Sequence, residues 1–263
     1  MSAPARTPLV LLHGWGMTPA VWQPLVAALG EEAGVDVRAP ALPGHGGDGG
    51  HGDDGAARPA ATLAAWAEAL VRALPPAAVL VGWSLGALLA LELARTRPDR
   101  ITRLILFGST PRFVAAPDWP HGLDAATVAA FVDGYATSPA ATLRRFFALQ
   151  SLGDAGRGQI LPRLGAAGVA HAGQALPALA DGLRLLAETD LRAGIASIGQ
   201  PTCLIHGDGD ALMPPAAARW LAGALPRARL VVLENRGHAP FLSDPTGCAA
   251  VIRASLDAAG NRP

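Results

Sequence analysis

The chain has 263 residues, of which 51% are hydrophobic and 16% are charged, and its 21 basic residues balance its 21 acidic ones. Every basic residue is an arginine, which excludes chemistry that needs a lysine, such as a Schiff base or a Ser-Lys dyad. A net charge of zero gives no overall electrostatic attraction for nucleic acid. No apolar run reaches the roughly 18 residues that a membrane span needs. We therefore expect a protein that binds neither nucleic acid nor membrane.

Short apolar runs bounded by turn residues recur along the chain, and each has the length and composition of a buried strand. They lie at 9–12, 35–38 (the weakest), 79–81, 101–107, 203–205 and 230–233. Ala- and Leu-rich stretches with a helical pattern alternate with them, at 21–29, 62–74, 85–97 and 216–225. This alternation predicts an α/β fold with a mostly parallel, doubly wound sheet that is covered by helices on both faces.

Two segments interrupt the alternation. Residues 44–58 are rich in Gly, Asp and His, a composition that buries too little apolar surface to order a long element, so we expect a loop. From about 111 to 195 helical patterns replace the strands, which predicts a helical lid inserted above the carboxyl-terminal edge of the sheet. We expect residues 1–263 to form one domain that includes this lid.

The motif Gly-Trp-Ser-Leu-Gly at 82–86 follows a predicted strand directly and precedes a predicted helix. This is the G-x-S-x-G nucleophile elbow in its strand-turn-helix context, and it predicts Ser84 as a nucleophile. Glycines flank the serine because the tight turn brings neighbouring backbone too close for a Cβ atom. The elbow is typical of the α/β-hydrolase fold.

A serine nucleophile needs a base within hydrogen-bonding reach, and seven histidines compete for that role. His238 is the best placed, because it follows the last predicted strand and so emerges at the carboxyl edge of the sheet. An orienting carboxylate is expected after the preceding strand, where Asp208 and Asp210 both lie. We favour Asp210 for its spacing from Gly207 and Pro214, and we retain Asp208 as the alternative.

The segment His-Gly-Trp-Gly at 13–16 follows the first strand, where this fold places its second oxyanion donor. The backbone N–H groups of Trp15 and Leu85 are therefore predicted to face the developing oxyanion. His13 itself is expected to be structural. Cys203 and Cys248 lie far apart without metal-ligand spacing, so we predict no disulfide, no metal site and no cofactor, and a reducing, cytoplasmic location.

Four segments together resemble the pimeloyl-acyl-carrier-protein methyl ester carboxylesterases of biotin synthesis, a family of α/β-hydrolases. They are HGWG at 13–16, GWSLG at 82–86, RFFALQ at 145–150 and GHAPF at 237–241. The resemblance runs from Leu9 to the C-terminal helix, and its specificity rests on the two tryptophans and the lid segment. It implies an enzyme that cleaves the methyl ester at one end of the pimeloyl chain while the other end stays on the carrier protein.

The resemblance also implies a substrate site and a partner. Substrate-binding residues would be Trp15, Ser84, Leu85, Phe146, Phe147, Ala148, Leu149, Gln150 and His238. Carrier-protein contacts would come from Arg144, Arg145, Arg157 and Arg163, because carrier proteins are acidic and guanidinium groups suit carboxylates and phosphates. The alternatives are that the aromatic residues only pack the lid and that the arginines form a solvated face.

Few residues precede Leu9, so the antiparallel strands that usually open this family are expected to be missing or shortened. The resulting hypothesis is a monomeric serine esterase that works through an acyl-enzyme. One alternative keeps the three catalytic residues but acts on small esters, lactones or a C–C bond. Another, of a different class, is a non-catalytic receptor that binds a small molecule in the same pocket.

Overall fold

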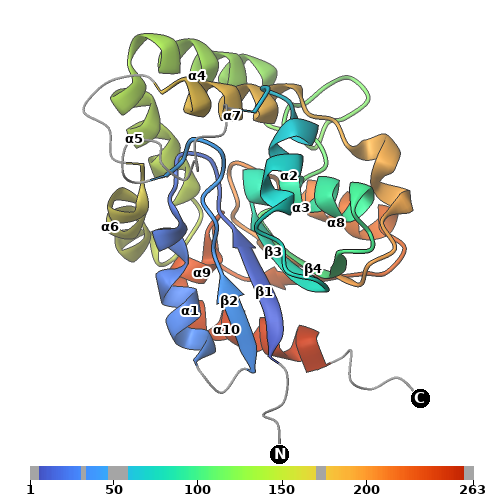
Figure 1. Ribbon diagram of the computed structural model, residues 1–263. Coiled ribbons are helices and arrows are strands. Elements are labelled where there is room, and N and C mark those ends of the chain that lie inside the picture. Colours follow the sequence, from blue (N-terminus) through green and yellow to red (C-terminus); the bar gives the residue numbers. More distant parts are fainter. Residues whose placement is uncertain (1–5, 31–33, 47–58, 170–175, 258–263) are drawn as a thin grey trace, which may run out of the picture.

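A computed structural model describes residues 6–30, 34–46, 59–169 and 176–257. Its described strands form one six-stranded sheet in the order β2-β1-β3-β4-β5-β6, and every neighbouring pair is parallel (Figure 1). The strands are β1 (Thr7–Leu12), β2 (Val35–Arg38), β3 (Ala78–Trp83), β4 (Ile101–Phe107), β5 (Thr202–Gly207) and β6 (Ala228–Leu233). All six apolar runs predicted as strands are therefore confirmed. The described sheet opens with the parallel pair of β1 and β2.

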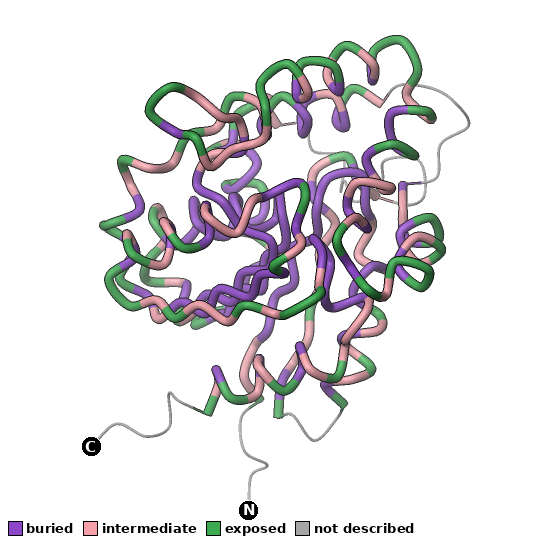
Figure 2. Tube along the Cα trace, turned by 180° about the vertical axis from the view of Figure 1, so that it is seen from behind, coloured by how far each residue is buried: buried purple, intermediate pink, exposed green. Residues whose placement is uncertain are grey.

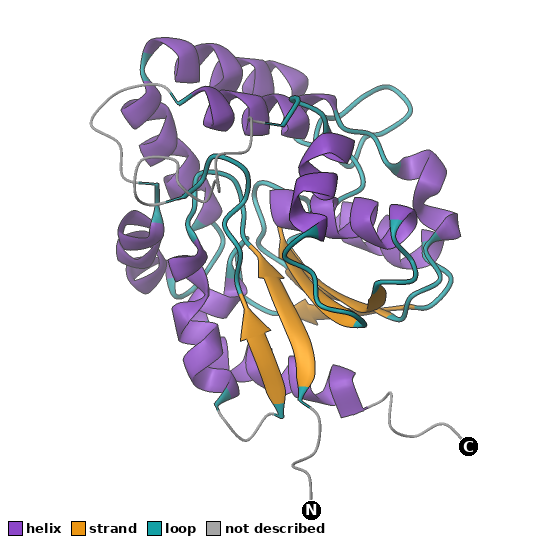
Figure 3. Ribbon diagram, in the orientation of Figure 1, coloured by secondary structure: helices purple, strands orange, loops and turns teal. Residues whose placement is uncertain are grey.

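Helices cover both faces of the sheet, as Figure 3 shows. They are η1 (Pro19–Trp22), α1 (Gln23–Leu29), α2 (Leu63–Val71), α3 (Leu85–Thr96), α8 (Pro215–Ala224), α9 (Pro240–Ser243) and α10 (Pro245–Asp257). The four helices predicted from the periodicity are present within a few residues of their expected bounds. The fold therefore has the three layers that the low charge content indicates, with a sheet buried on both sides.

The strand sequences explain the two cores. In β1, Leu9 and Leu11 point into the cluster formed with α1 and α10, whereas Val10 and Leu12 point into the cluster formed with α2 and α3. Successive side chains of a strand face opposite sides of the sheet, so a strand that is apolar at every position needs cover on both faces. Figure 2 shows the result, in which buried residues run through the centre of the molecule and exposed ones line its outer helices.

The lid lies between β4 and β5. It comprises α4 (Ala125–Thr137), α5 (Pro139–Gln150), α6 (Arg157–Ala167) and α7 (Pro177–Glu188), and the short helix η3 (Arg192–Ser197) leads back to the sheet. Figure 1 shows α4 and α7 across the end to which the strand arrows point, and α5 and α6 beside it. The helical insertion predicted at about 111–195 is confirmed. That the chain forms a single domain stays a prediction.

The loops that carry the predicted site all leave the carboxyl ends of the strands. β1 pairs with β2 on one side and β3 on the other, so the order in which successive strands are added to the sheet reverses there, and β1 and β3 end side by side. Open α/β sheets bind ligands at such a switch point. The segment predicted as a loop at 44–58 lies outside the described residues from position 47 onward.

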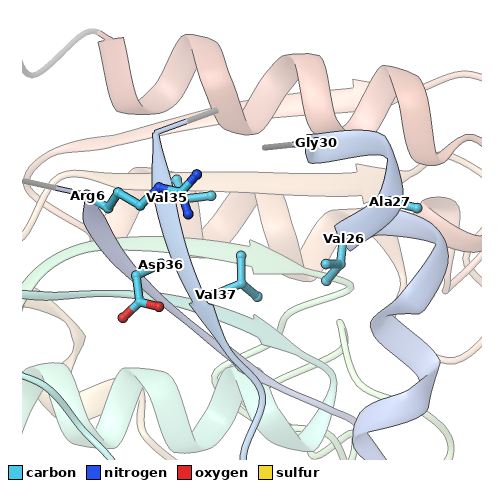
Figure 4. Close-up of a pocket in the computed structure, with 7 residues that line it drawn as sticks. All are labelled: Arg6, Val26, Ala27, Gly30, Val35, Asp36 and Val37. Atoms are coloured by element: carbon cyan, nitrogen blue, oxygen red, sulfur yellow. The ribbon is translucent and has the colours of Figure 1, made fainter. Parts of the chain in front are cut away.

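Figure 4 shows a hollow of about 420 Å³ beside the edge strand. It is lined by Arg6, Val26, Ala27, Gly30, Val35, Asp36 and Val37. These residues lie near the amino ends of β1 and β2 and the end of α1, away from the carboxyl ends where the predicted site residues gather. In the part of the chain that the structure describes, no helix is long and apolar enough to cross a membrane.

Candidate active site

Ser84 occupies a strained turn between β3 and α3. Its backbone has φ 58° and ψ −118°, a conformation that a non-glycine residue adopts at a cost of about 1–3 kcal/mol. A Cβ atom on Gly82 would lie 2.7 Å from the Cα of Ala87, and one on Gly86 would lie 2.1 Å from the carbonyl oxygen of Leu12. Both flanking positions therefore require glycine. The Ser84 hydroxyl makes no capping hydrogen bond to α3, so the helix does not occupy it.

His238 is held by a buried carboxylate. Its Nδ1 lies 2.7 Å from Oδ2 of Asp210, and both side chains are fully buried. The other oxygen of Asp210, Oδ1, accepts hydrogen bonds of 2.9 Å from the backbone amides of Leu212 and Met213. Because Oδ2 can only accept a hydrogen bond, Nδ1 of His238 must be the donor, which leaves Nε2 free to take a proton.

The surroundings keep Asp210 ionised. Burial raises the pKa of its carboxyl, but the charge and hydrogen bond of His238, together with His206 and the Met213 amide, outweigh that effect and lower the pKa below its ordinary value. Nε2 of His206 lies 3.5 Å from Oδ2 of Asp210. Asp208, the alternative carboxylate, is exposed. The structure thus places Asp210, and not Asp208, against the histidine.

His238 lies against Trp83, the residue immediately before Ser84, with ring centroids 5.6 Å apart. The indole N–H of Trp83 donates a 2.9 Å hydrogen bond to the His238 carbonyl, and the Ser84 amide donates one of 3.2 Å to the carbonyl of Phe107. Nε2 of His238 is buried and has no hydrogen-bond partner among the described residues. This nitrogen is therefore available to a serine hydroxyl or to a substrate leaving group.

Gly108, directly after β4, forms the surface against which the imidazole packs. Its φ is +46°, and a Cβ atom there would lie 2.8 Å from Nδ1 of His238. We expect Gly108→Ala to displace the ring from Asp210 and to lower kcat by about 10- to 100-fold, because small misplacements of a catalytic group have effects of this size. Gly199→Ala, whose Cβ would meet open space, is the matched control and should retain wild-type kcat. Equal rates in the two variants would contradict this packing role.

The two predicted oxyanion donors have free amides. Leu85 is the first residue of α3, and neither its backbone N–H nor that of Trp15 donates a hydrogen bond to any residue that the structure describes. The loop after β1 lies directly against the elbow, since a Cβ on Gly14 would be 3.3 Å from that of Ser84. Backbone amides without a partner among the described residues, in segments next to Ser84, are the kind of donor that an oxyanion hole uses.

His13 supports this loop. Its Nδ1 donates to the carbonyl of Gly14 at 2.9 Å, and its Nε2 accepts from the amide of Leu42 at 3.1 Å. Burial and the nearby His45 lower the pKa of His13 to about 3, although the hydrogen bond to Gly14 acts in the opposite direction. A neutral histidine with both nitrogens engaged has a structural role, as predicted.

The depressed pKa of His13 makes folding stability sensitive to acid. Between its ordinary value of 6.5 and about 3 the unfolded chain binds a proton that the folded chain excludes, so stability falls as the pH falls through this window. We expect a slope of up to about 1 kcal/mol per pH unit from this residue. Urea denaturation between pH 7.5 and 4.5 should show a shallower slope for His13→Gln, the remainder coming from His206, whose pKa is also lowered by burial. An unchanged slope would contradict this.

The lid places the predicted substrate residues around Trp15. The indole contacts the rings of Phe146 and Tyr135 edge to face, with centroids 4.9 and 5.6 Å away, and donates a 2.7 Å hydrogen bond to the carbonyl of Leu179. Phe146 is buried, and Phe147, Ala148 and Leu149 are half-buried. Gln150 is 1% exposed, and its Oε1 has no hydrogen-bond partner among the described residues.

The four predicted carrier-contact arginines lie on α5 and α6. Arg144, Arg145 and Arg157 are exposed, and Arg163 is half-buried, with its guanidinium donating to the carbonyl of Leu242. The guanidinium of Arg145 stacks 5.1 Å from the centre of the Phe131 ring. Arg144 and Arg157 are thus the two of this set with neither of these contacts. Within the described ranges no cluster of His, Cys, Asp or Glu could hold a metal ion.

Comparison with known proteins identifies the family. The model of the alpha/beta hydrolase family matches residues 9–251. The chain belongs to this family. This α/β-hydrolase superposes on an esterase from Exiguobacterium antarcticum with a TM-score of 0.77 and on a bromoperoxidase from Bacillus anthracis with 0.78, over 96% of this chain and 92% of each of theirs. Identities of 20% and 22% make these likenesses of fold alone.

Curated relatives within the family are much more similar. The pimeloyl-[acyl-carrier protein] methyl ester esterase of Aromatoleum aromaticum is 53% identical over 253 residues, which cover 94% of this chain and 97% of that one. The protein of the same name from Nitrosomonas europaea is 38% identical, over 90% of both chains. The α/β-hydrolase described here thus groups with these esterases, as the sequence motifs predict.

Three residues of the site have no signal in the sequence that singles them out. Gly108 follows a strand, and a glycine there indicates at most a close backbone approach. His206 reads as a strand residue, and Asp154 reads as a helix N-cap. Gly108 and Asp154 contact residues that are distant in sequence. His206 contacts Asp210, four residues away, but that contact depends on how the turn after β5 folds.

Proposed function

We propose that this α/β-hydrolase is a serine carboxylesterase that hydrolyses the methyl ester of pimeloyl-acyl-carrier protein in biotin synthesis. The observation that carries the proposal is the 53% identity, over nearly the full length of both chains, to an esterase named for that substrate. The hydrogen-bonded pair of Asp210 and His238 and the strained backbone of Ser84 support the chemistry. Neither a metal nor an organic cofactor is needed for it.

The proposed reaction proceeds in two steps. His238 accepts the proton of Ser84 at Nε2, and the serine oxygen attacks the ester carbonyl to give a tetrahedral oxyanion facing the amides of Trp15 and Leu85. Collapse expels methanol, which takes the proton from His238, and leaves an acyl-enzyme. Water activated by the same nitrogen then releases the carboxylate, while Asp210 holds the imidazole and stabilises its cation throughout. Each oxyanion donor contributes roughly 3–4 kcal/mol to transition-state binding.

The apolar chain of the substrate needs a slot between the elbow and the lid. Trp15 and Leu85 form its floor in the proposal, and the half-buried side chains of Phe147, Ala148 and Leu149 form its wall. Phe146 is 1% exposed and packs between Trp15 and Phe131, so it shapes the slot by holding Trp15. A largely apolar slot with few polar anchors suits a pimeloyl chain.

The carrier protein requires a cationic face on an enzyme with no net charge. We assign this role to the arginines of α5 and α6, which lie on the outside of the lid. Contacts of this kind act through long-range attraction, which salt screens, so they affect substrate capture more than chemistry.

We expect the double variant Arg144→Ala/Arg157→Ala to raise KM for the carrier-bound ester about 10-fold at low salt, with less effect at high salt. Both side chains are exposed and touch no reacting group. KM for a short nitrophenyl ester should be unchanged. Arg227→Ala, at the amino end of β6 and outside the lid, is the matched control. A double variant that binds the carrier-bound ester normally would remove these arginines from the carrier interface.

The substrate assignment is tested by comparing kcat/KM for three methyl or aryl esters with purified protein. The carrier-bound pimeloyl methyl ester should exceed free dimethyl pimelate by at least about 10-fold, because binding energy from the carrier is used in the transition state. Short nitrophenyl esters measure the activity of Ser84, His238 and Asp210 without any contribution from the carrier protein. If the short esters were turned over efficiently and the carrier-bound ester were not, the protein would be a small-ester hydrolase instead.

We also propose that the enzyme is a cytoplasmic monomer. Its two cysteines are buried and free, which fits a reducing compartment. Sedimentation velocity at the concentrations used for kinetics tests the oligomeric state, and a dimer under those conditions would overturn this part of the proposal.

A further inference from the structure

Asp154, in the turn that joins α5 to α6, directs a fully buried carboxylate at the loop that carries His238. Its Oδ2 accepts a 2.9 Å hydrogen bond from the backbone N–H of Gly237, the residue immediately before His238. The same oxygen accepts from the hydroxyl of Ser243, also at 2.9 Å. Its Oδ1 accepts from the amide of Gly156 at 2.7 Å. The lid thus contributes a charged group to the immediate support of the catalytic loop.

The backbone around Asp154 contacts both the loop that carries His238 and the loop that carries Asp210. The amide of Ala155 donates a 2.9 Å hydrogen bond to the carbonyl of Asn235 in the histidine loop. On the other side Gly153 and Gly209 pack backbone against backbone, because a Cβ on either would lie 2.0 to 2.3 Å from the carbonyl oxygen of the other. The turn therefore contacts the base loop and the acid loop at once.

The charge of Asp154 fits this role better than a neutral side chain would. A buried carboxylate is costly unless several donors satisfy it, and a charged acceptor forms shorter and stronger hydrogen bonds to backbone N–H groups. Here three donors and the guanidinium of Arg236, 3.9 Å from Oδ1, provide that environment. Arg236 also lies 3.6 Å from Asp244.

Asp154 completes the set of contacts that fixes His238 in space. The indole of Trp83 holds the carbonyl of His238, Gly108 supports the ring, and Asp210 binds Nδ1. On the amino-terminal side of His238, the N–H of the preceding residue, Gly237, donates a hydrogen bond to Asp154. Catalytic groups must be held within about 0.5 Å by such supporting contacts.

We propose that Asp154 is a positioning residue for His238, so that the α5–α6 turn of the lid is part of the catalytic apparatus. This inference rests on the proposed role of His238 as the base. Because α5 and α6 also carry the arginines assigned to the carrier protein, docking and catalysis meet at this turn.

Asp154→Asn is the informative variant, because the amide has the size of the carboxylate but only one acceptor oxygen. Whichever way it is oriented, its NH₂ group faces donors, either Gly237 N–H or Gly156 N–H. We expect kcat for a short nitrophenyl ester to fall about 10- to 100-fold while KM changes less than about 2-fold. Rates are expressed per active site, counted by labelling of Ser84 with a fluorophosphonate. Asp133→Asn, an exposed carboxylate on α4, is the control.

A second readout is the NMR resonance of the Nδ1 proton that His238 shares with Asp210, identified by its loss in Asp210→Ala. It should shift or broaden in Asp154→Asn and stay in place in Asp133→Asn. If Asp154→Asn does not fold, Ser243→Ala takes its place, because it removes one donor to the carboxylate and keeps the charge. A lower kcat with unchanged KM supports the proposal in either variant.

Wild-type kcat per labelled site, with an unmoved resonance, overturns the positioning role. The positioning role is also overturned if the substitution lowers only the melting temperature or only the fraction of protein that is labelled. A residue with a purely structural role would give that result. Failure of the proposed serine-esterase chemistry looks different, since wild-type protein would then not label at Ser84 at all. Failure of the substrate assignment alone would leave the nitrophenyl-ester comparison of the variants unaffected.

Discussion

Ser84→Ala is expected to abolish ester hydrolysis, with kcat/KM at least about 10⁴-fold below that of the wild type. The remaining His238 and the amides of Trp15 and Leu85 could only direct water at the ester, because no oxygen is left to form the acyl-enzyme. The substitution keeps the Cβ atom and the φ of 58°, so the strain of the elbow and the fold should be unchanged. Initial rates with a nitrophenyl ester, together with the melting temperature, check both statements.

Fluorophosphonate labelling is the companion measurement for Ser84. Wild-type protein should gain one label on this residue, and Ser84→Ala should gain none, because the probe reacts only with an activated serine. Labelling of the variant would reveal a different nucleophile. If wild-type protein bound apolar esters but resisted both labelling and turnover, the chain would be a hydrolase-like receptor and the catalytic assignment would be wrong.

Asp210→Asn is the substitution with the next largest expected effect, about 10³- to 10⁴-fold in kcat. Oδ1 of Asp210 accepts from the amides of Leu212 and Met213, so an asparagine must keep its carbonyl oxygen there and turn its NH₂ group towards His238. Two donors cannot face each other, so Nδ1 of His238 must give up its proton and Nε2 must carry one. The imidazole then cannot accept the proton of Ser84.

Asp208→Asn is the matched control for this prediction, because Asp208 lies two residues away and is exposed. Its kcat should stay within about 2-fold of wild type, as is usual for a surface change that removes no specific interaction. The reverse result, a large loss in Asp208→Asn and none in Asp210→Asn, would assign the orienting carboxylate to the other residue.

The strands and the order of the catalytic residues follow from local sequence. A short apolar run such as 101–107, bounded by turn residues, favours a buried strand, and steric contact requires the glycines on either side of Ser84. Once the sheet is parallel, every loop that follows a strand reaches the same edge. Ser84, Asp210 and His238 can therefore be predicted to lie at the same edge of the sheet from the sequence alone.

The contacts that refine the site depend on tertiary packing instead. Asp208 and Asp210 share one turn, and in the folded structure Asp210 is buried against His238 and the amides of Leu212 and Met213, whereas Asp208 is exposed. Asp154 accepts a hydrogen bond from the amide of Gly237, 83 residues away, and no local sequence pattern predicts a contact over that separation. In the same way the lid motif identifies Phe146, whereas its packing between Trp15 and Phe131 appears only once the lid is folded.

We expect Ser84 of this enzyme to hydrolyse the methyl ester, and not the thioester, of a carrier-bound pimeloyl chain. Intact-mass spectrometry of the carrier protein after incubation in ¹⁸O-labelled water distinguishes the two ends of the same substrate. We predict that wild-type enzyme releases methanol and leaves a carrier that still bears the pimeloyl chain, now with one ¹⁸O atom in its free carboxylate, and that Ser84→Ala leaves the substrate unchanged. A carrier that has lost its acyl chain, or a methyl ester left intact by wild-type enzyme, would contradict the proposed role of Ser84.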